Sequence, residues 1–313
     1  MKGIDLARSY YLEHGAPMLK RDFPEIEPLI AVGLVGSGSE CFGYDDDIST
    51  DHDFEPGFCL FIPDEDIIDR KLEFALERAY SKLPREFMGF ARCSTAPVGS
   101  RRHGVIRMSD FFVEKIGSPT GDLSLEDWFS IPEHALAEAT NGEIFKDDLG
   151  SFSQIRNKLL QMPEDVRLKK LAGHLLLMAQ SGQYNYYRCI SRGETGAAQL
   201  AVIEFVKSTI QVIFLLNKKF MPYYKWSFRA LSELEKLSQL SYSLEYLISS
   251  ENNESNSKLK YDMIEDIASL IIEELKAQDL SDAICGDLEK HAYSVNDRIA
   301  DSSIRNKNIF YAV

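Results

Sequence analysis

The chain has 313 residues, 44% of them hydrophobic, and a formal net charge of −14. This length and apolar content allow a sizeable core and predict one large or two medium domains. A strongly negative charge repels phosphate backbones at long range, which disfavours a long nucleic acid as partner. Five cysteines without CxxC spacing indicate reduced, buried thiols and argue against a structural zinc site.

No apolar run predicts a membrane span or a signal peptide. The longest apolar stretch, residues 200–216, is interrupted by Glu204, Lys207 and Gln211. The N-terminus becomes acidic at Asp5 and has no apolar segment typical of a secretory leader. We therefore expect a cytoplasmic protein that does not engage a membrane.

The N-terminal part alternates between helical and extended patterns. Residues 4–21 have helical periodicity with an interruption at Gly15-Ala16-Pro17, and residues 29–35 form a short apolar run that predicts a buried strand. Residues 54–62 predict a second strand, which Pro56-Gly57 must bend. The sequence therefore indicates a mixed helical and extended domain in this region.

Further elements follow the second strand. Asp64 is the expected N-cap of the next helix, and residues 104–108 predict a third strand. Ser109 or Asp110 is expected to begin another helix.

From about residue 151 onward, the pattern is that of amphipathic helices. The predicted helices cover residues 152–161, 164–180, 197–216, 227–237 and 258–276. Ser151 is the expected N-cap of the first, and Gly182 lies just past the expected end of the second. We predict an α+β fold: a small mixed sheet with flanking helices in residues 1–149, followed by an all-α bundle in residues 150–313.

Two aspartates precede the second predicted strand with one residue between them. On an extended chain Asp51 and Asp53 point to the same side, while His52 points to the other. Two such carboxylates repel each other unless a cation lies between them, and Mg²⁺ commonly combines one or two carboxylates with substrate phosphates. The pair therefore predicts a site for Mg²⁺ or Mn²⁺, although an acidic pair alone is also typical of a solvated loop.

A glycine- and serine-rich segment follows the first predicted strand directly. Gly36 and Gly38 would allow a phosphate to approach the main chain. The free main-chain N–H groups of this segment and the hydroxyls of Ser37 and Ser39 could donate hydrogen bonds to it. Such a segment alone is more often a simple turn. Its position before the paired aspartates is what favours phosphoryl or nucleotidyl transfer.

Together these motifs resemble a known signature. Gly36-Ser37 followed by Asp51-x-Asp53 resembles that of the polymerase-beta-like nucleotidyltransferase superfamily, which includes the kanamycin-type antibiotic nucleotidyltransferases. The segment as a whole is similar to one functionally unassigned bacterial branch with a C-terminal helical domain. Other segments also resemble that branch: Gly104-Val105, Phe111-Phe112, Asp127-Trp128, Leu171-Ala172 and Pro222-Tyr223-Tyr224-Lys225-Trp226. The resemblance extends to about Leu234.

The resemblance implies that Gly36 and Ser37 contact nucleotide phosphates and that Asp51 and Asp53 hold the metal. The superfamily often has a third carboxylate on a later strand, but residues 104–108 contain none. If that strand continues, Asp110 would point to the same side as Ile106 and Met108 and could reach the site. It could also act as a helix N-cap.

Candidate partners for these motifs occur in the helical half. Arg188 and Glu194 lie in a turn rich in tyrosine, where a base could stack and an arginine could pair with phosphate. Glu194 is a candidate general base for the acceptor. Tyr224 and Lys225 lie in an aromatic stretch in which an unpaired ammonium would be costly, so we expect a phosphate or an acidic residue to neutralise Lys225.

We therefore expect a metal-dependent nucleotidyltransferase that transfers a nucleoside monophosphate from a nucleoside triphosphate, with ATP as the expected donor. The acceptor would be a hydroxyl on a small molecule or a protein, and pyrophosphate would leave. The alternative is an inactive nucleotide-binding module that regulates a protein partner through the helical half.

Overall fold

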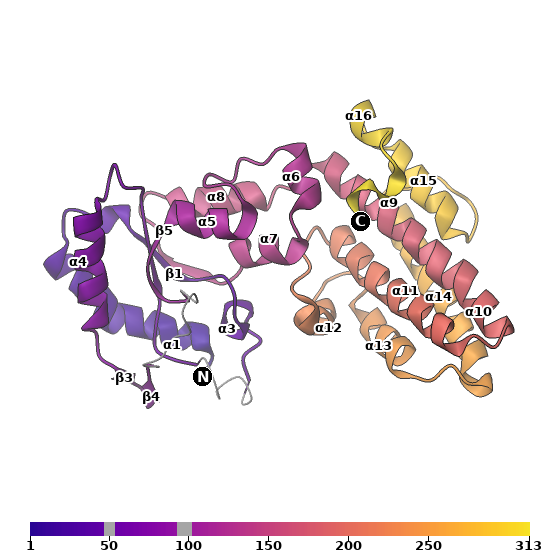
Figure 1. Cartoon of the computed structure of the whole chain (residues 1–313), viewed down its shortest axis with the longest axis horizontal. Coiled ribbons are helices and arrows are strands. Elements are labelled where there is room, and N and C mark those ends of the chain that lie inside the picture. Colours follow the sequence, from indigo (N-terminus) through magenta and orange to yellow (C-terminus); the bar gives the residue numbers. More distant parts are fainter. Residues whose placement is uncertain (47–53, 93–101) are drawn as a thin grey trace. The chain divides into compact units, whose positions relative to one another are not determined.

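The computed structural model describes residues 1–46, 54–92 and 102–313, which form two compact units (Figure 1). Unit 1 consists of Met1–Leu123 and Ala135–Gln161, and unit 2 of Ser124–His134 and Met162–Val313. The chain thus enters unit 2 briefly and returns to unit 1 before its long helical part. The functional division into residues 1–149 and 150–313 stays a prediction.

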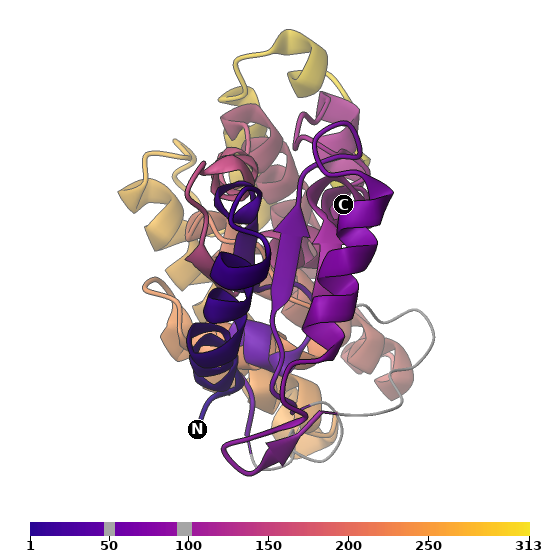
Figure 2. The same ribbon diagram turned by 90° about the vertical axis from the view of Figure 1, so that its left-hand side faces the viewer.

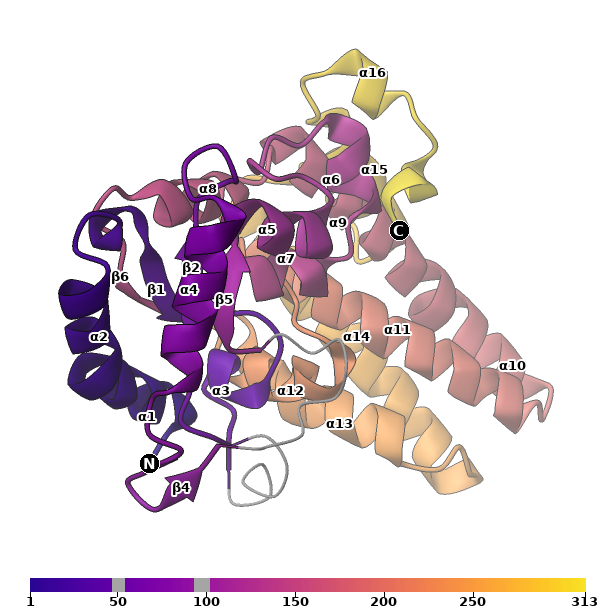
Figure 3. The ribbon, with the colours of Figure 1, turned by 60° about the vertical axis from the view of Figure 1, so that its left-hand side comes forward.

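Unit 1 is built on a four-stranded mixed sheet with the order β5-β2-β1-β6 (Figure 3). β1 (Ala31–Leu34) pairs antiparallel with β2 (Cys59–Ile62) and with β6 (Glu143–Lys146). β2 pairs in parallel with β5 (Gly104–Arg107). The predicted α+β class with a small mixed sheet is therefore confirmed, and the end of β1 lies beside the starts of β2 and β5.

One face of this sheet is covered by α1 (Gly3–Tyr10), α2 (Ala16–Asp22) and α4 (Arg70–Ser81), which Figure 2 brings to the front. Their apolar side chains share one core with those of the strands: Leu6, Tyr10, Leu19, Val32, Leu60, Leu76, Tyr80 and Val105. α4 begins after Asp69, whose carboxylate accepts the N–H of Leu72. The prediction that Asp64 is the N-cap of this helix is therefore wrong, because a turn at residues 64–68 precedes the helix.

The other face packs against α5 (Met108–Ile116) and α8 (Ser151–Leu159) through aromatic rings. The ring of Phe61 on β2 lies 5.2 Å from that of Phe111 on α5 and 4.1 Å from that of Phe152 on α8. These contacts fix α5 against the sheet. The predicted N-cap Ser151 is the first residue of α8, and Gly150 occupies the cap position.

Shorter elements complete unit 1. They are α3 (Ser39–Phe42), the hairpin of β3 (Glu86–Phe87) and β4 (Phe90–Ala91), and α7 (Glu133–Thr140), whose first two residues belong to unit 2.

The predicted interruption of the first helix is a π-helical turn rather than a break. α1 continues through Tyr11–Gly15 into α2, and Pro17, which has no N–H to donate, follows this π-helical turn directly. Gly15 faces the sheet here: a Cβ on it would lie 2.4 Å from the ring of Phe58 and 2.8 Å from that of Tyr11. The absence of a side chain therefore allows the helix to approach the start of β2.

Gly15→Ala should lower the free energy of unfolding by about 1–2 kcal/mol, because the added methyl must displace two buried rings. Chemical denaturation followed by circular dichroism measures this loss. Gly196→Ala is the control, since Gly196 lies in α11 with no atom within 4 Å of its Cβ position. A Gly15→Ala protein as stable as the Gly196→Ala protein would contradict the packing described here.

Unit 2 is entirely helical in the residues described. α9 (Glu164–Met178) packs against α11 (Thr195–Leu216), and Arg167 donates to the backbone oxygen of Leu215 between them. The remaining helices are α6 (Leu125–Ser130), α10 (Tyr187–Ser191), α12 (Tyr224–Ser232), α13 (Ser241–Ser249), α14 (Glu254–Ala277), α15 (Leu288–Asp297) and α16 (Ser302–Arg305).

The predicted end of the second amphipathic helix before Gly182 is wrong. α9 continues through a π-helical segment, Ala179–Tyr186, directly into α10. A Cβ on Gly182 would lie 2.4 Å from the ring of Phe205 on α11, so this glycine serves close helix packing rather than termination. Tertiary packing here overrides the local preference of glycine for helix ends.

Among the described residues, only α11 combines the length and hydropathy of a membrane-spanning helix. Within its most apolar window, 61% of the residues are buried inside the protein. α11 packs against α9 and α13, which is the behaviour of a core helix.

His174 on α9 is held neutral in the interior of unit 2. Its Nδ1 atom is buried and has no hydrogen-bond partner among the described atoms. Burial, reinforced by the charges of Lys170 and Lys207, lowers the pKa of the imidazole to about 3.

Candidate functional site

Unit 1 contains a cavity of about 340 Å³ where the end of β1 meets the starts of β2 and β5. α5 forms one wall of it. The lining residues are Val35, Gly36, Ser37, Cys59, Arg102, Ile106, Asp110, Phe111, Glu114 and Lys115. The lining combines apolar side chains with two cations, Arg102 and Lys115, and two carboxylates, Asp110 and Glu114. Gly36 and Ser37, which were predicted to contact a phosphate, therefore both line this cavity.

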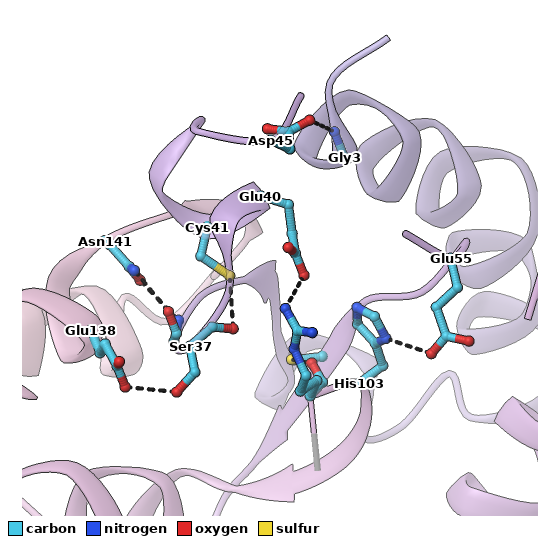
Figure 4. Close-up of polar contacts among 12 residues, drawn as sticks. Gly3, Ser37, Glu40, Cys41, Asp45, Glu55, His103, Glu138 and Asn141 are labelled. Atoms are coloured by element: carbon cyan, nitrogen blue, oxygen red, sulfur yellow. Dashed lines mark hydrogen bonds and ion pairs between the residues drawn. The ribbon is translucent and has the colours of Figure 1, made fainter. Parts of the chain in front are cut away.

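The main chain at Gly36 is fixed by Asn141, which follows α7 directly (Figure 4). The Gly36 N–H donates to Asn141 Oδ1, and Asn141 Nδ2 donates to the Gly36 oxygen, each over 2.8 Å. Gly36 has a φ of +103°, a conformation that favours glycine. Because Asn141 takes the Gly36 N–H, this group is not a free phosphate donor, contrary to the sequence-based expectation.

The hydroxyl of Ser37 belongs to a three-membered polar cluster. It donates to Glu138 Oε2 over 2.7 Å and accepts from Lys115 Nζ over 2.9 Å. Lys115 Nζ also donates to the same Oε2 atom over 2.8 Å. The cluster joins the β1 loop, α5 and α7, and its two charged side chains are largely shielded, with exposed fractions of 13% and 19%.

A second cation lies on the opposite side of the loop. Arg102 Nη2 donates to Glu40 Oε1 over 2.6 Å, and the backbone oxygen of Arg102 accepts the thiol of Cys59 over 3.2 Å. Burial raises the pKa of the Cys59 thiol to about 12, so it stays protonated and is not a nucleophile near neutral pH. The cavity therefore offers charge and hydrogen bonds rather than covalent chemistry.

The prediction that all five cysteines are buried is wrong. Cys41 and Cys59 are buried, whereas Cys189 is half-buried and Cys285 is exposed. All four are free thiols, which agrees with the absence of a disulfide framework.

The predicted metal ligands Asp51 and Asp53 lie outside the described residues. Within the described ranges, no group of three His, Cys, Asp or Glu side chains is placed to hold a metal ion. Ser39 is the first residue of α3 and does not line the cavity described above.

Asp110 is not an N-cap. β5 ends at Arg107, which is also the residue before α5, and Asp110 lies in the first turn of that helix. There its exposed carboxylate lines the same cavity as Gly36 and Ser37. Its role as a third metal ligand stays a prediction.

Residues predicted from the helical half lie at two ends of α11. Arg188 stacks on Tyr184, with its guanidinium 4.7 Å from the ring centre, and Glu194 is the exposed residue before α11. Tyr224 and Lys225 follow the other end of that helix. With 22 residues, α11 spans about 33 Å, so unit 2 does not bring the two pairs together.

Lys225 does not have the environment that the sequence suggested. Its side chain is exposed and lies over the ring of Trp226, with Nζ 5.0 Å from the ring centre. Water solvates an exposed ammonium, so the burial argument for a phosphate partner no longer applies. Its role in nucleotide binding, like that of Tyr224, Arg188 and Glu194, stays a prediction.

Comparison with known proteins gives one match. A family model described as a domain of unknown function (DUF4037) matches residues 128–227. No curated protein and no solved structure matches the chain. The matched segment contains Glu138 and Asn141 but not Gly36 or Ser37.

Sequence reasoning missed Lys115, Glu138, Asn141 and Arg102. One signal for Lys115 was present: it follows Phe111 by four residues, so a core-facing aromatic places it on the helix side that borders the sheet. Glu138 and Asn141 carry no comparable signal, because their partners are about a hundred residues away in sequence.

Proposed function

We propose that the protein is a metal-dependent nucleotidyltransferase. It transfers a nucleoside monophosphate from a nucleoside triphosphate, with ATP as the expected donor, to a hydroxyl acceptor on a small molecule or a protein. The observation that carries this proposal is the cavity at the end of β1, which gathers Ser37 and two cations beside the start of β2. Asp53 precedes that start by only six residues.

Asp51 and Asp53 would hold Mg²⁺ or Mn²⁺, with Asp110 as a further oxygen donor bordering the same cavity. When bound, the ion supplies charge neutralisation for the phosphates and lowers the pKa of the acceptor hydroxyl. Lys115 and Arg102 would offset negative charge on the phosphate oxygens, and Ser37 would donate a hydrogen bond to one of them. The apolar lining residues Val35, Ile106 and Phe111 would limit water around these groups.

The second candidate is a nucleotide-binding regulatory module. One observation favours it: the Gly36 N–H and the Ser37 hydroxyl are both engaged within the protein. A site closed in this way could bind a nucleotide slowly without turnover.

Label should pass from α-labelled nucleoside triphosphate to an acceptor only when a divalent metal is present. The assay incubates the protein with Mg²⁺ or Mn²⁺ and a panel of amino sugars, polyols and proteins, and measures labelled product and pyrophosphate. EDTA should reduce both to background, because the phosphates then lose their metal. Transfer from γ-labelled but not α-labelled nucleotide would instead indicate a kinase, and binding without pyrophosphate release would support the regulatory module.

A further inference from the structure

One carboxylate oxygen in unit 1 accepts hydrogen bonds from a hydroxyl and from an ammonium, two groups that commonly bind phosphate. Glu138 Oε2 lies 2.7 Å from the Ser37 hydroxyl and 2.8 Å from the Lys115 ammonium. These donors come from the β1 loop and α5, and both line the 340 Å³ cavity, whereas Glu138 comes from α7 and does not. Glu138 Oε2 therefore lies where an anionic ligand oxygen would have to lie to contact both donors.

A hydroxyl and an ammonium that converge on a single anionic oxygen form a common arrangement for a phosphate oxygen. In this structure Glu138 supplies that oxygen from within the chain. We propose that Ser37 and Lys115 form a phosphate subsite, and that Glu138 occupies it until a phosphate-bearing ligand displaces its carboxylate. That the ligand is a nucleotide rests on the proposed function; the subsite itself requires only a phosphate group.

The surrounding structure allows Glu138 to leave without disturbing the loop. Asn141, three residues further along the chain, holds Gly36 through two hydrogen bonds of its own, which do not involve the Glu138 side chain. Lys115 is supported separately, since its side chain is largely shielded and its helix is held by Phe111. The donors would therefore keep their positions after the carboxylate moves.

An exposed ion pair of unit 1 serves as a matched comparison. Lys158 pairs with Asp122, their side chains are 48% and 72% exposed, and neither residue lines the cavity. Charges so exposed are screened by water. Neutralising Asp122 therefore removes the same charge as neutralising Glu138, but at a position away from the cavity.

Glu138→Gln should bind inorganic pyrophosphate about tenfold more tightly than the wild type, because the subsite loses its anionic occupant. Isothermal calorimetry with pyrophosphate at fixed ionic strength and without divalent metal measures the affinity. Lys115→Met should weaken binding about tenfold or more. Asp122→Asn and Lys158→Met are the controls, since these two residues pair with each other away from the cavity.

Tighter binding in Glu138→Gln but not in Asp122→Asn supports the subsite. Equal effects of the two variants would indicate a general charge effect and overturn it, as would unchanged affinity in Lys115→Met. Melting curves of each variant identify loss of folding, and Lys115→Arg, which keeps the charge, should retain most of the binding if Lys115→Met is too unstable to test. A supported subsite without nucleotidyl transfer would contradict the proposed function alone.

Discussion

Asp51→Asn/Asp53→Asn should lower the rate of nucleotidyl transfer by about a thousandfold or more. The two changes keep the size of the side chains but remove both negative charges that would hold the metal, so stabilisation of the developing phosphate charge is lost. The measurement is the initial rate of label transfer from α-labelled nucleotide at saturating Mg²⁺. Binding of metal-free nucleotide should change little, because the cations and Ser37 remain.

The chain offers a control with the same spacing. Asp64 and Asp66, also separated by one residue, are exposed and follow the opposite end of β2. Asp64→Asn/Asp66→Asn removes the same charge and should leave the transfer rate within about twofold, since exposed charges beyond a Debye length are screened. Equal loss in both double variants, or an unchanged rate in the first, would contradict the assignment of the metal site.

Acidification from pH 7 to pH 5 should cost the wild type about 2 kcal/mol of unfolding free energy through His174 alone. The folded imidazole has a pKa of about 3, whereas that of an unfolded histidine is about 6.5. Because the folded pKa lies below the unfolded one, the unfolded chain takes up the proton first. Stability is therefore fully present above pH 6.5 and is lost progressively as the pH falls toward 3.

His174→Gln removes this titration. Between pH 7 and pH 5, the unfolding free energy of the variant should therefore fall by about 2 kcal/mol less than that of the wild type. Urea denaturation at pH 7 and pH 5 measures both values. His134→Gln, a change in the same unit at a half-buried position, is the control and should follow the wild type. An identical pH dependence in His174→Gln and wild type would show that the imidazole of His174 does not titrate as described.

β1, β2 and β5 were predictable because each is a short apolar run next to glycine or a turn. They lie within the predicted residues 29–35, 54–62 and 104–108. β6 was missed because it has only two apolar residues, which lie between a glutamate and a lysine, and all four of its residues are only half-buried at the sheet edge. Such a strand is specified by its pairing with β1 and by the ion pair of Arg8 with Glu143 rather than by its own pattern.

The candidate site was only partly predictable for a related reason. Gly36 and Ser37 stand out because a glycine-rich turn directly follows a buried strand. Their partners Lys115, Glu138 and Asn141 come from α7 and α5, and only the folded chain brings them together. Lys225 shows the opposite error, since an aromatic sequence context suggested burial where the side chain is exposed.

The brief excursion of the chain into unit 2 affects how the protein can be divided. A recombinant fragment limited to the family-matched residues 128–227 would carry β6 without β1, the strand with which it pairs. It would also carry α9 and α11 without α14 and α15, leaving their apolar sides open. An unpaired edge strand and an uncovered helix face both promote aggregation, so this segment should be insoluble on its own. The solubility of this segment therefore depends on residues 1–127 and 228–313, which the family match does not cover.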